Sequence, residues 1–111
     1  MDEKELTEMR ILVDFKFPLE PFSSMVRNGT AGQAIERVLG DIKPEAVYFS
    51  ARNGQRGGIA IVEITDASKL PAIAEPLFLT FNATVEFHPI MTPDDLAKAG
   101  LDDLGKKYSG T

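Results

Sequence analysis

Cysteine is absent from the chain, and this absence excludes a disulfide framework, a thiolate nucleophile and any metal site with cysteine ligands. Tryptophan is also absent, and histidine occurs only once, as His88. Basic residues are scarce, with 12 Lys and Arg against 17 Asp and Glu, and they cluster only at Lys106-Lys107. Since nucleic acids and anionic membranes are bound through basic surfaces, we expect neither as a partner.

Long hydrophobic runs are lacking as well. No stretch approaches the roughly 20 apolar residues of a membrane-spanning helix. The first eight residues carry four acids and one lysine, the opposite of a signal-peptide start, so a cytoplasmic location is expected. We expect residues 1–9 to form a flexible arm and residues 10–108 to fold as a single domain.

The strongest local signal is the step Asn53-Gly54, which is typical of a tight β-turn. It lies between two runs of apolar and β-branched residues, 45–52 and 58–64. We interpret them as two strands joined by a turn that extends from Arg52 to Gly58. The second run is apolar on both faces, which predicts a central strand.

Two further strands and several helices are predicted from periodicity. Apolar residues alternate over 10–17 and over 81–90, as they do in strands with one buried face. Helical spacing predicts a broken helical region over 22–41, in which Thr30 caps the second part. A helix capped by Asp66 or Ser68 should kink or end at Pro76. The segment Thr92-Pro93-Asp94-Asp95 predicts a short helix that Gly100 closes, and another turn follows over 101–108.

The order of these elements is strand, helix, strand, strand, helix, strand. It predicts an α+β fold of ferredoxin-like βαββαβ type, with a four-stranded antiparallel sheet, helices on one face and an additional C-terminal helix. The first and third strands are expected in the middle of the sheet, parallel to each other.

One face of this sheet should remain uncovered by helices. It would carry Leu12, Asp14, Lys16, Tyr48, Ser50, Arg52, Ile59, Ile61, Glu63, Thr84, Glu86 and His88. Ile59 and Ile61 would form an apolar patch at its centre, and such patches on single chains usually mark an interface. We therefore expect a homodimer in which two sheets pack face to face around a two-fold axis.

His88 is the leading candidate for chemistry, since histidine titrates near neutral pH. We hypothesise that His88 acts as a base or hydrogen-bond partner and that Glu86 or Asp14 orients it. Tyr48, Arg52, Lys16 and Glu63 are the candidate ligand-binding residues. The alternative is that the same side chains form cross-strand or interface contacts.

Other sites are less favoured by the sequence. His88 with carboxylates, or two His88 side chains across a two-fold axis, could hold Zn or Mn, but no ligand spacing indicates this, and neither metal nor cofactor is expected. Arg52 and Arg56 could hold an anion, although the need of Asn53-Gly54 for positive φ explains the turn by itself. Glu75 beside Pro76 could serve a site, but capping or exposure to solvent explains it equally well.

Several segments resemble a family of uncharacterised small bacterial proteins. They are residues 43–49, 54–56, 70–78 and 87–96, and the similarity extends from Met9 to Tyr108. More distantly the chain resembles the dimeric α/β-barrel superfamily, which includes muconolactone-isomerase-like enzymes, cofactor-free monooxygenases, and stress-responsive or ligand-binding modules. The Asn, Trp and His set of its haem-degrading members is not assembled here, because the chain has no Trp.

Together these observations suggest a cofactor-free site for a small organic acid or aromatic compound, lying between the open sheet face and the helices. Tyr48 and Arg52 would hold an anionic group, and the compatible reactions are proton transfer within a ring and oxygenation of a carbanion. The competing interpretation is a non-enzymatic dimerisation or ligand-sensing module.

Overall fold

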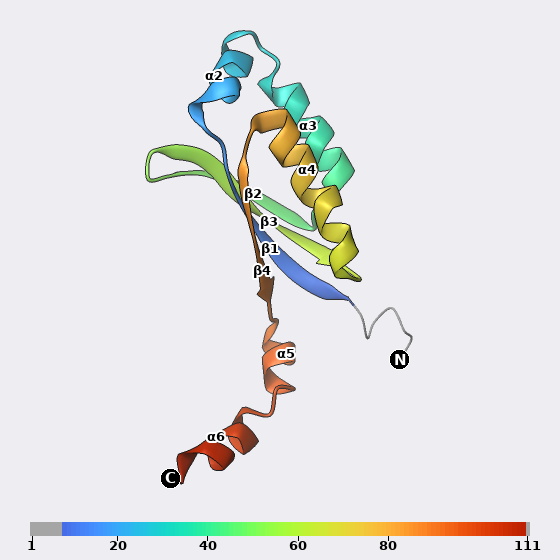
Figure 1. Cartoon of the computed structure of the whole chain (residues 1–111), viewed down its shortest axis with the longest axis vertical. Coiled ribbons are helices and arrows are strands. Elements are labelled where there is room, and N and C mark those ends of the chain that lie inside the picture. Colours follow the sequence, from blue (N-terminus) through green and yellow to red (C-terminus); the bar gives the residue numbers. More distant parts are fainter. Residues whose placement is uncertain (1–7, 111) are drawn as a thin grey trace.

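The computed structural model describes residues 8–110 and shows an α+β fold (Figure 1). Its strands are β1 (Met9–Lys16), β2 (Ala46–Arg52), β3 (Gln55–Ile64) and β4 (Thr84–Ile90). Its α-helices are α2 (Leu19–Arg27), α3 (Ala31–Ile42), α4 (Leu70–Phe81), α5 (Pro93–Ala97) and α6 (Leu101–Ser109). Residues 1–7 of the expected N-terminal arm lie outside the described residues, whereas Met9 pairs with Ile64 in the sheet.

The four strands form one sheet in the order β2-β3-β1-β4, and every neighbouring pair is antiparallel. The expectation that the first and third strands are parallel is therefore wrong. The hairpin between β2 and β3 reverses the chain, so β3 runs against both of its neighbours, and β1 and β2 point in the same direction on either side of it. β3 is a central strand, as its apolar faces predict.

Helices α3 and α4 cover one face of the sheet (Figure 1). Alternate residues of β1 and β3 are buried beneath them, and they pack against the apolar stripes of the two helices. Phe81 at the end of α4 is 1% exposed and contacts the rings of Phe17 and Phe22. The alternating pattern thus identifies the core face correctly, since neighbouring residues of a strand point to opposite faces.

The turn between β2 and β3 is much shorter than expected. Both strands extend to its edges, and only Asn53 and Gly54 lie between them, with φ of 54° and 73°. Two central residues with positive φ give a turn whose twist matches that of the flanking strands, so pairing continues to Arg52 and Gln55.

Two expectations about helix ends are also wrong. Of the two outcomes expected at Pro76, a kink or the end of the helix, the end is wrong. α4 continues to Phe81, because the packing of Ile73, Leu77 and Phe81 against the core compensates for the lost backbone hydrogen bond. Phe81 consequently belongs to the helix, and β4 begins only at Thr84. Thr30 precedes α3 but its side chain makes no capping hydrogen bond to the helix, since its hydroxyl donates to Asn28 instead.

The C-terminal helices follow the expected signals. Thr92 and Asp95 form a capping box at the start of α5, and Gly100 takes a left-handed conformation with φ of 75° before α6. Both helices extend away from the sheet beyond the end of β4 (Figure 1). The longest α-helices of residues 8–110 have 12 residues, and none could cross a bilayer.

Candidate functional site

The face of the sheet opposite α3 and α4 carries the predicted site residues, and we call it the open face. Strand register places the residues in rows across it. Tyr48, Ile59, Asp14 and Glu86 form one row, and Ala46, Ile61, Leu12 and His88 form the next. Within residues 8–110, no helix covers these rows (Figure 1).

Asp14 and Arg52 form a polar contact of the open face through two hydrogen bonds. The two terminal nitrogens of Arg52 donate to the two carboxylate oxygens of Asp14 at 2.6 and 3.2 Å, and one of them also donates to the carbonyl oxygen of Gly58. The side chain of Asp14 is 21% exposed. The hydrogen bonds from Arg52 lower the pKa of Asp14 below its usual value, so the carboxyl stays ionised at neutral pH.

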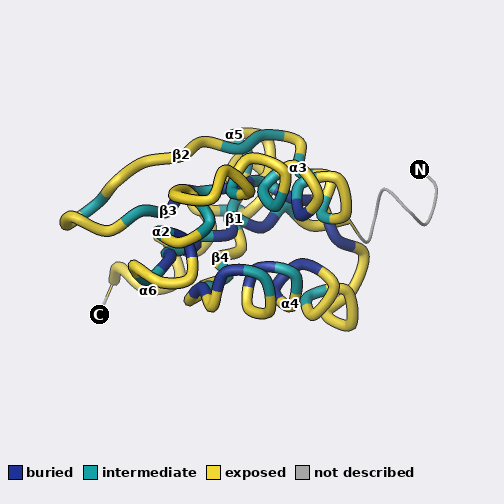
Figure 2. Tube along the Cα trace, turned by 90° about the horizontal axis from the view of Figure 1, so that it is seen from above, coloured by how far each residue is buried: buried dark blue, intermediate teal, exposed yellow. Residues whose placement is uncertain are grey.

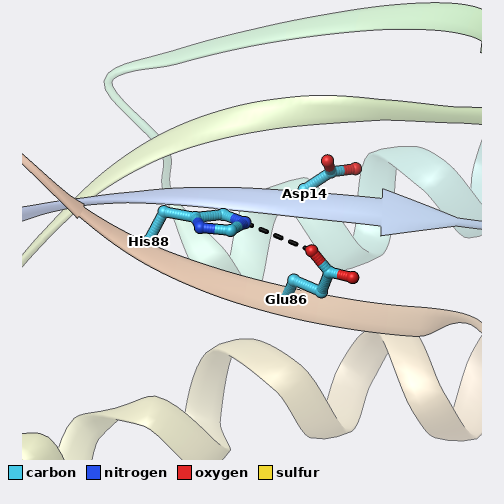
Figure 3. A group of neighbouring side chains, drawn as sticks. All are labelled: Asp14, Glu86 and His88. Atoms are coloured by element: carbon cyan, nitrogen blue, oxygen red, sulfur yellow. Dashed lines mark hydrogen bonds and ion pairs between the residues drawn. The ribbon is translucent and has the colours of Figure 1, made fainter.

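Glu86 and His88 meet beside Asp14 (Figure 3). They are two residues apart on β4 and therefore point to the same side, with 3.2 Å between Nε2 of His88 and Oε2 of Glu86. Asp14 of β1 is paired directly with Glu86 across the sheet. One ligand atom from each of the three side chains lies within 4.8 Å of the other two, so the expected association of these residues is present.

The remaining predicted residues lie at different distances from this group. Lys16 is close enough to Asp14 to lower its pKa electrostatically. Tyr48 is in the same row as Asp14, but β3 separates the two strands, and its side chain is 65% exposed. Glu63 pairs with Arg10, four residues along β1 from Asp14, and takes no part in the group.

The site does not lie between the sheet and the helices, as the sequence interpretation placed it. An open, mainly apolar hollow of about 370 Å³, lined by residues such as Phe22, Ile35 and Phe49, lies at the edge of that space. Deeper in the core, residues such as Val13, Val38 and Phe81 line an apolar recess of about 20 Å³. This is little more than the space that one water molecule needs. All the candidate polar side chains point instead to the open face, because they alternate with the core residues along each strand.

Sequence reasoning missed a second polar group on the open face. Arg10 pairs with Glu45 at 2.8 Å and with Glu63 at 3.1 Å, and these contacts raise its pKa. Together with Asp95 of α5, Arg10 and Glu63 line a polar hollow of about 360 Å³ at the end of the sheet. The signal was present, since Arg10 continues the alternation of Leu12 and Asp14.

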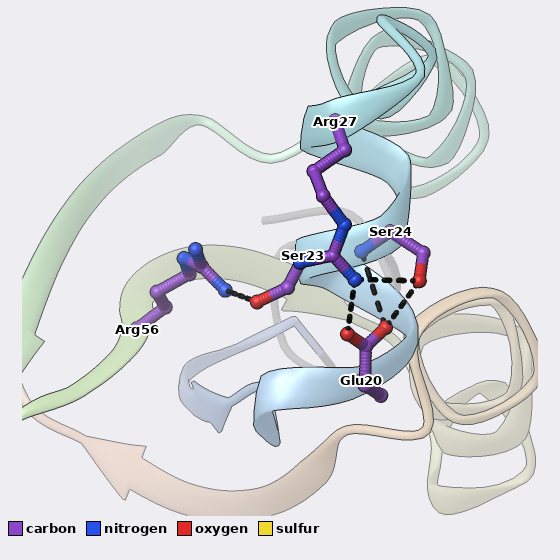
Figure 4. A network of polar contacts seen from close by, with 5 residues as sticks. All are labelled: Glu20, Ser23, Ser24, Arg27 and Arg56. Atoms are coloured by element: carbon purple, nitrogen blue, oxygen red, sulfur yellow. Dashed lines mark hydrogen bonds and ion pairs between the residues drawn. The ribbon is translucent and has the colours of Figure 1, made fainter.

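Arg56 does not join the open face. Its Nη1 donates to the hydroxyl of Ser23 (Figure 4). Its guanidinium also lies 5.1 Å from the ring centre of Phe22. Beside it, Glu20 accepts hydrogen bonds from Ser24 and Arg27, and the Ser24 hydroxyl and the Arg27 guanidinium lower the pKa of Glu20. These contacts attach α2 to the hairpin and stabilise its first turn, so a structural role accounts for Arg56 better than a shared anion site with Arg52.

A cation could be coordinated only at the group of Asp14, Glu86 and His88, as far as residues 8–110 show. Two carboxylates and one imidazole suit Zn or Mn. However, Arg52 already compensates the charge of Asp14, and Glu86 and His88 remain 68% and 53% exposed. The arrangement is better suited to hydrogen bonding and proton transfer than to a closed metal site.

Comparison of the chain with protein-family models, with curated proteins and with solved structures gives no match.

Proposed function

We propose that this chain is a homodimer of ferredoxin-like domains that binds a small organic acid or aromatic compound on its open face. The strand order β2-β3-β1-β4 and the helical connections on one face support the ferredoxin-like assignment. The observation that carries the proposal is the meeting of Asp14, Glu86 and His88 beside an uncovered apolar patch.

The apolar half of the face supports both dimerisation and binding. Leu12, Ile59 and Ile61 lie next to one another across β1 and β3, and all three remain partly exposed. Apolar surface at the centre of a sheet is stabilised when a second surface excludes water from it. An aromatic ring of a ligand or the sheet of a second copy would exclude water from these residues.

The polar half would orient the ligand. Arg52 pairs with Asp14, so its charge is compensated, although it retains N–H groups for which residues 8–110 supply no acceptor. Lys16 lies next to this pair and would attract a ligand carboxylate. The sequence suggested that Arg52 binds an anionic group of the ligand. In this proposal Arg52 instead positions Asp14.

The proposed chemistry is proton transfer by His88. Its imidazole would accept a proton from the bound compound, and the neighbouring Glu86 would stabilise the imidazolium that forms. Return of the proton to another atom of the ligand is an isomerisation. If the proton is taken from carbon, the carbanion that remains could instead form a C–O bond with molecular oxygen as a co-substrate. Carbon is then oxidised, oxygen is reduced to the peroxide level, and the proton returns from His88 to give a hydroperoxide.

A non-enzymatic module is the second candidate, and the exposure of the polar pair favours it. Glu86 and His88 are more than half exposed in the single chain, so the site is not shielded from water without a partner. In this case His88 and Glu86 would form hydrogen bonds across the dimer interface.

Titration with benzoate, monitored by nuclear magnetic resonance, separates these candidates. Binding should shift the resonances of Lys16, Tyr48 and His88 in a saturable manner, and H88A should weaken the binding while the protein still dimerises. The matched variant R37A, on the far side of the molecule, should bind as the native protein does. A dimer in which benzoate leaves these resonances unchanged contradicts the binding proposal and favours the structural module.

A further inference from the structure

The last described helix, α6, carries an exposed apolar stripe. Leu101, Leu104 and Tyr108 recur at helical spacing and are 55%, 47% and 70% exposed. Asp102, Asp103 and Lys106 lie on its other side, whereas Nζ of Lys107 lies 5.4 Å from the ring centre of Tyr108. Figure 2 shows the whole helix as exposed. A helix of nine residues is too short to be stable in water by itself. It therefore requires a surface on which this stripe can pack.

The body formed by residues 8–90 does not supply that surface. α5 and α6 extend past the end of β4, away from α3 and α4 (Figure 1). The molecule measures 62 × 35 × 20 Å and has a radius of gyration of 18.0 Å. A compact chain of this length would have a radius of gyration of about 13 Å.

We propose that the C-terminal arm, residues 91–109, packs on a second copy of the chain at the rim of its open face. This inference rests on the proposed homodimer and adds a second element to its interface. The two arms would be exchanged symmetrically, each covering part of the other protomer.

The size of the open face supports an additional contact. Four strands spaced by about 4.8 Å and eight residues of about 3.3 Å give a face of roughly 500 Å². A stable interface buries about 800 Å² per partner. The flat area of the sheet is smaller than this value, and the exposed stripe of α6 would add apolar surface to the interface.

The position at which the arm leaves the domain also favours a second copy of the chain as its partner. Ile90, the last residue of β4, pairs with Arg10, and α5 remains near Arg10 through Asp95, so the arm leaves the domain at the rim of the open face. A copy that covers this face would lie beside the arm. Between α5 and α6 there is a hollow lined partly by Leu96 and Leu101, which could receive an exposed apolar side chain such as Tyr48.

Charge is also compatible with a second copy. The last turn of α6 carries Lys106 and Lys107, the one basic cluster of a chain with a net charge of −5. A helix that binds an anionic membrane carries many basic residues on its polar face, whereas α6 has Asp102 and Asp103 there.

The test compares two alanine pairs in the full chain. L101A/L104A removes apolar stripe residues, and D102A/K106A changes the opposite side without altering the net charge. We expect L101A/L104A to weaken the dimer at least about tenfold, measured by the mass in solution over a range of concentrations. D102A/K106A should leave the dimer nearly unchanged. An L101A/L104A variant that dimerises as tightly as the native protein overturns the inference.

A variant of the sheet separates this inference from the proposal on which it rests. If I61K is monomeric while L101A/L104A dimerises normally, the arm inference fails and the sheet interface stands. If L101A/L104A is monomeric while I61K dimerises, the arm contact stands and the sheet interface fails. A native protein that is monomeric at every concentration overturns both.

Cross-linking identifies directly the surface on which α6 packs. Because the chain has no cysteine, S109C at the end of α6 introduces a unique site for a photoreactive label without removing a residue of the stripe. In a mixture of isotopically light and heavy chains, we expect cross-links between light and heavy copies, with sites on β2 or β3. Cross-links confined to one chain, or binding of α6 to anionic vesicles in place of dimerisation, contradict the inference.

Discussion

Asp14 and Arg52 connect stability with the candidate site at the scale of single residues. D14N removes the carboxylate that accepts both Arg52 donors, so we expect the free energy of unfolding in urea to fall by about 1 kcal/mol at pH 7. Because Arg52 lowers the pKa of Asp14 in the folded chain, this stabilisation is present above the unfolded-state pKa and is lost as the pH falls through the folded-state value. The difference between D14N and the native protein should therefore disappear in acid.

The control for this prediction is D41N, which removes an exposed carboxylate from α3 and should change stability by less than about 0.5 kcal/mol. A D14N variant as stable as the native protein at pH 7 would show that the ion pair does not stabilise the fold. A difference in the free energy of unfolding between D14N and the native protein that persists in acid would show the same.

Glycine is required at position 58 of β3, because the backbone of β2 and the ring of Phe15 approach it closely. A Cβ atom there would overlap the carbonyl oxygen of Tyr48 and approach Cζ of Phe15 to 2.9 Å. G58A should therefore lower the free energy of unfolding by about 2 kcal/mol, as measured in urea. In G40A the new methyl group meets no atom within 4 Å, and this helix substitution should stabilise by up to about 1 kcal/mol. Equal effects of the two substitutions would contradict this account.

The hairpin is the element that the sequence predicts most directly. Gly54 has a φ of 73°, which other residues adopt at a cost, so G54A should lower the free energy of unfolding by about 1 kcal/mol. A drop of about 4 °C in the melting temperature would report this loss. In N53G the new glycine adopts the positive φ without penalty, so the melting temperature should be close to that of the native protein. A G54A variant with an unchanged melting temperature would contradict the two-residue turn.

Elements with local signals could be predicted, and elements decided by tertiary contacts could not. The start of α5 could be predicted because Thr92 and Asp95 form hydrogen bonds within four residues of chain. The core face of β1 could be predicted from the alternation of its residues. Pro76 misleads because the packing of α4, which sequence alone does not show, outweighs the local penalty. The Arg52–Asp14 pair joins side chains on strands separated by β3, so its geometry required the register.

At the scale of the whole molecule, the open face and the C-terminal arm both leave apolar side chains at least partly exposed. A symmetric dimer would cover both, and it would also shield Glu86 and His88 from water. Shielding strengthens the hydrogen bonds and charges that the proposed proton transfer uses. Dimerisation and the candidate chemistry are thus linked through one surface.

The most direct test of this account is the mass in solution of the native protein, I61K and L79K, measured by light scattering after gel filtration. Ile61 lies at the centre of the open face, whereas Leu79 is an 81% exposed apolar residue of α4. The account predicts about 24 kDa for the native protein and L79K, twice the 12.1 kDa of one chain, and 12.1 kDa for I61K. A native mass of 12.1 kDa, or an I61K variant that remains dimeric, would contradict the central claim that the open face is the dimer interface.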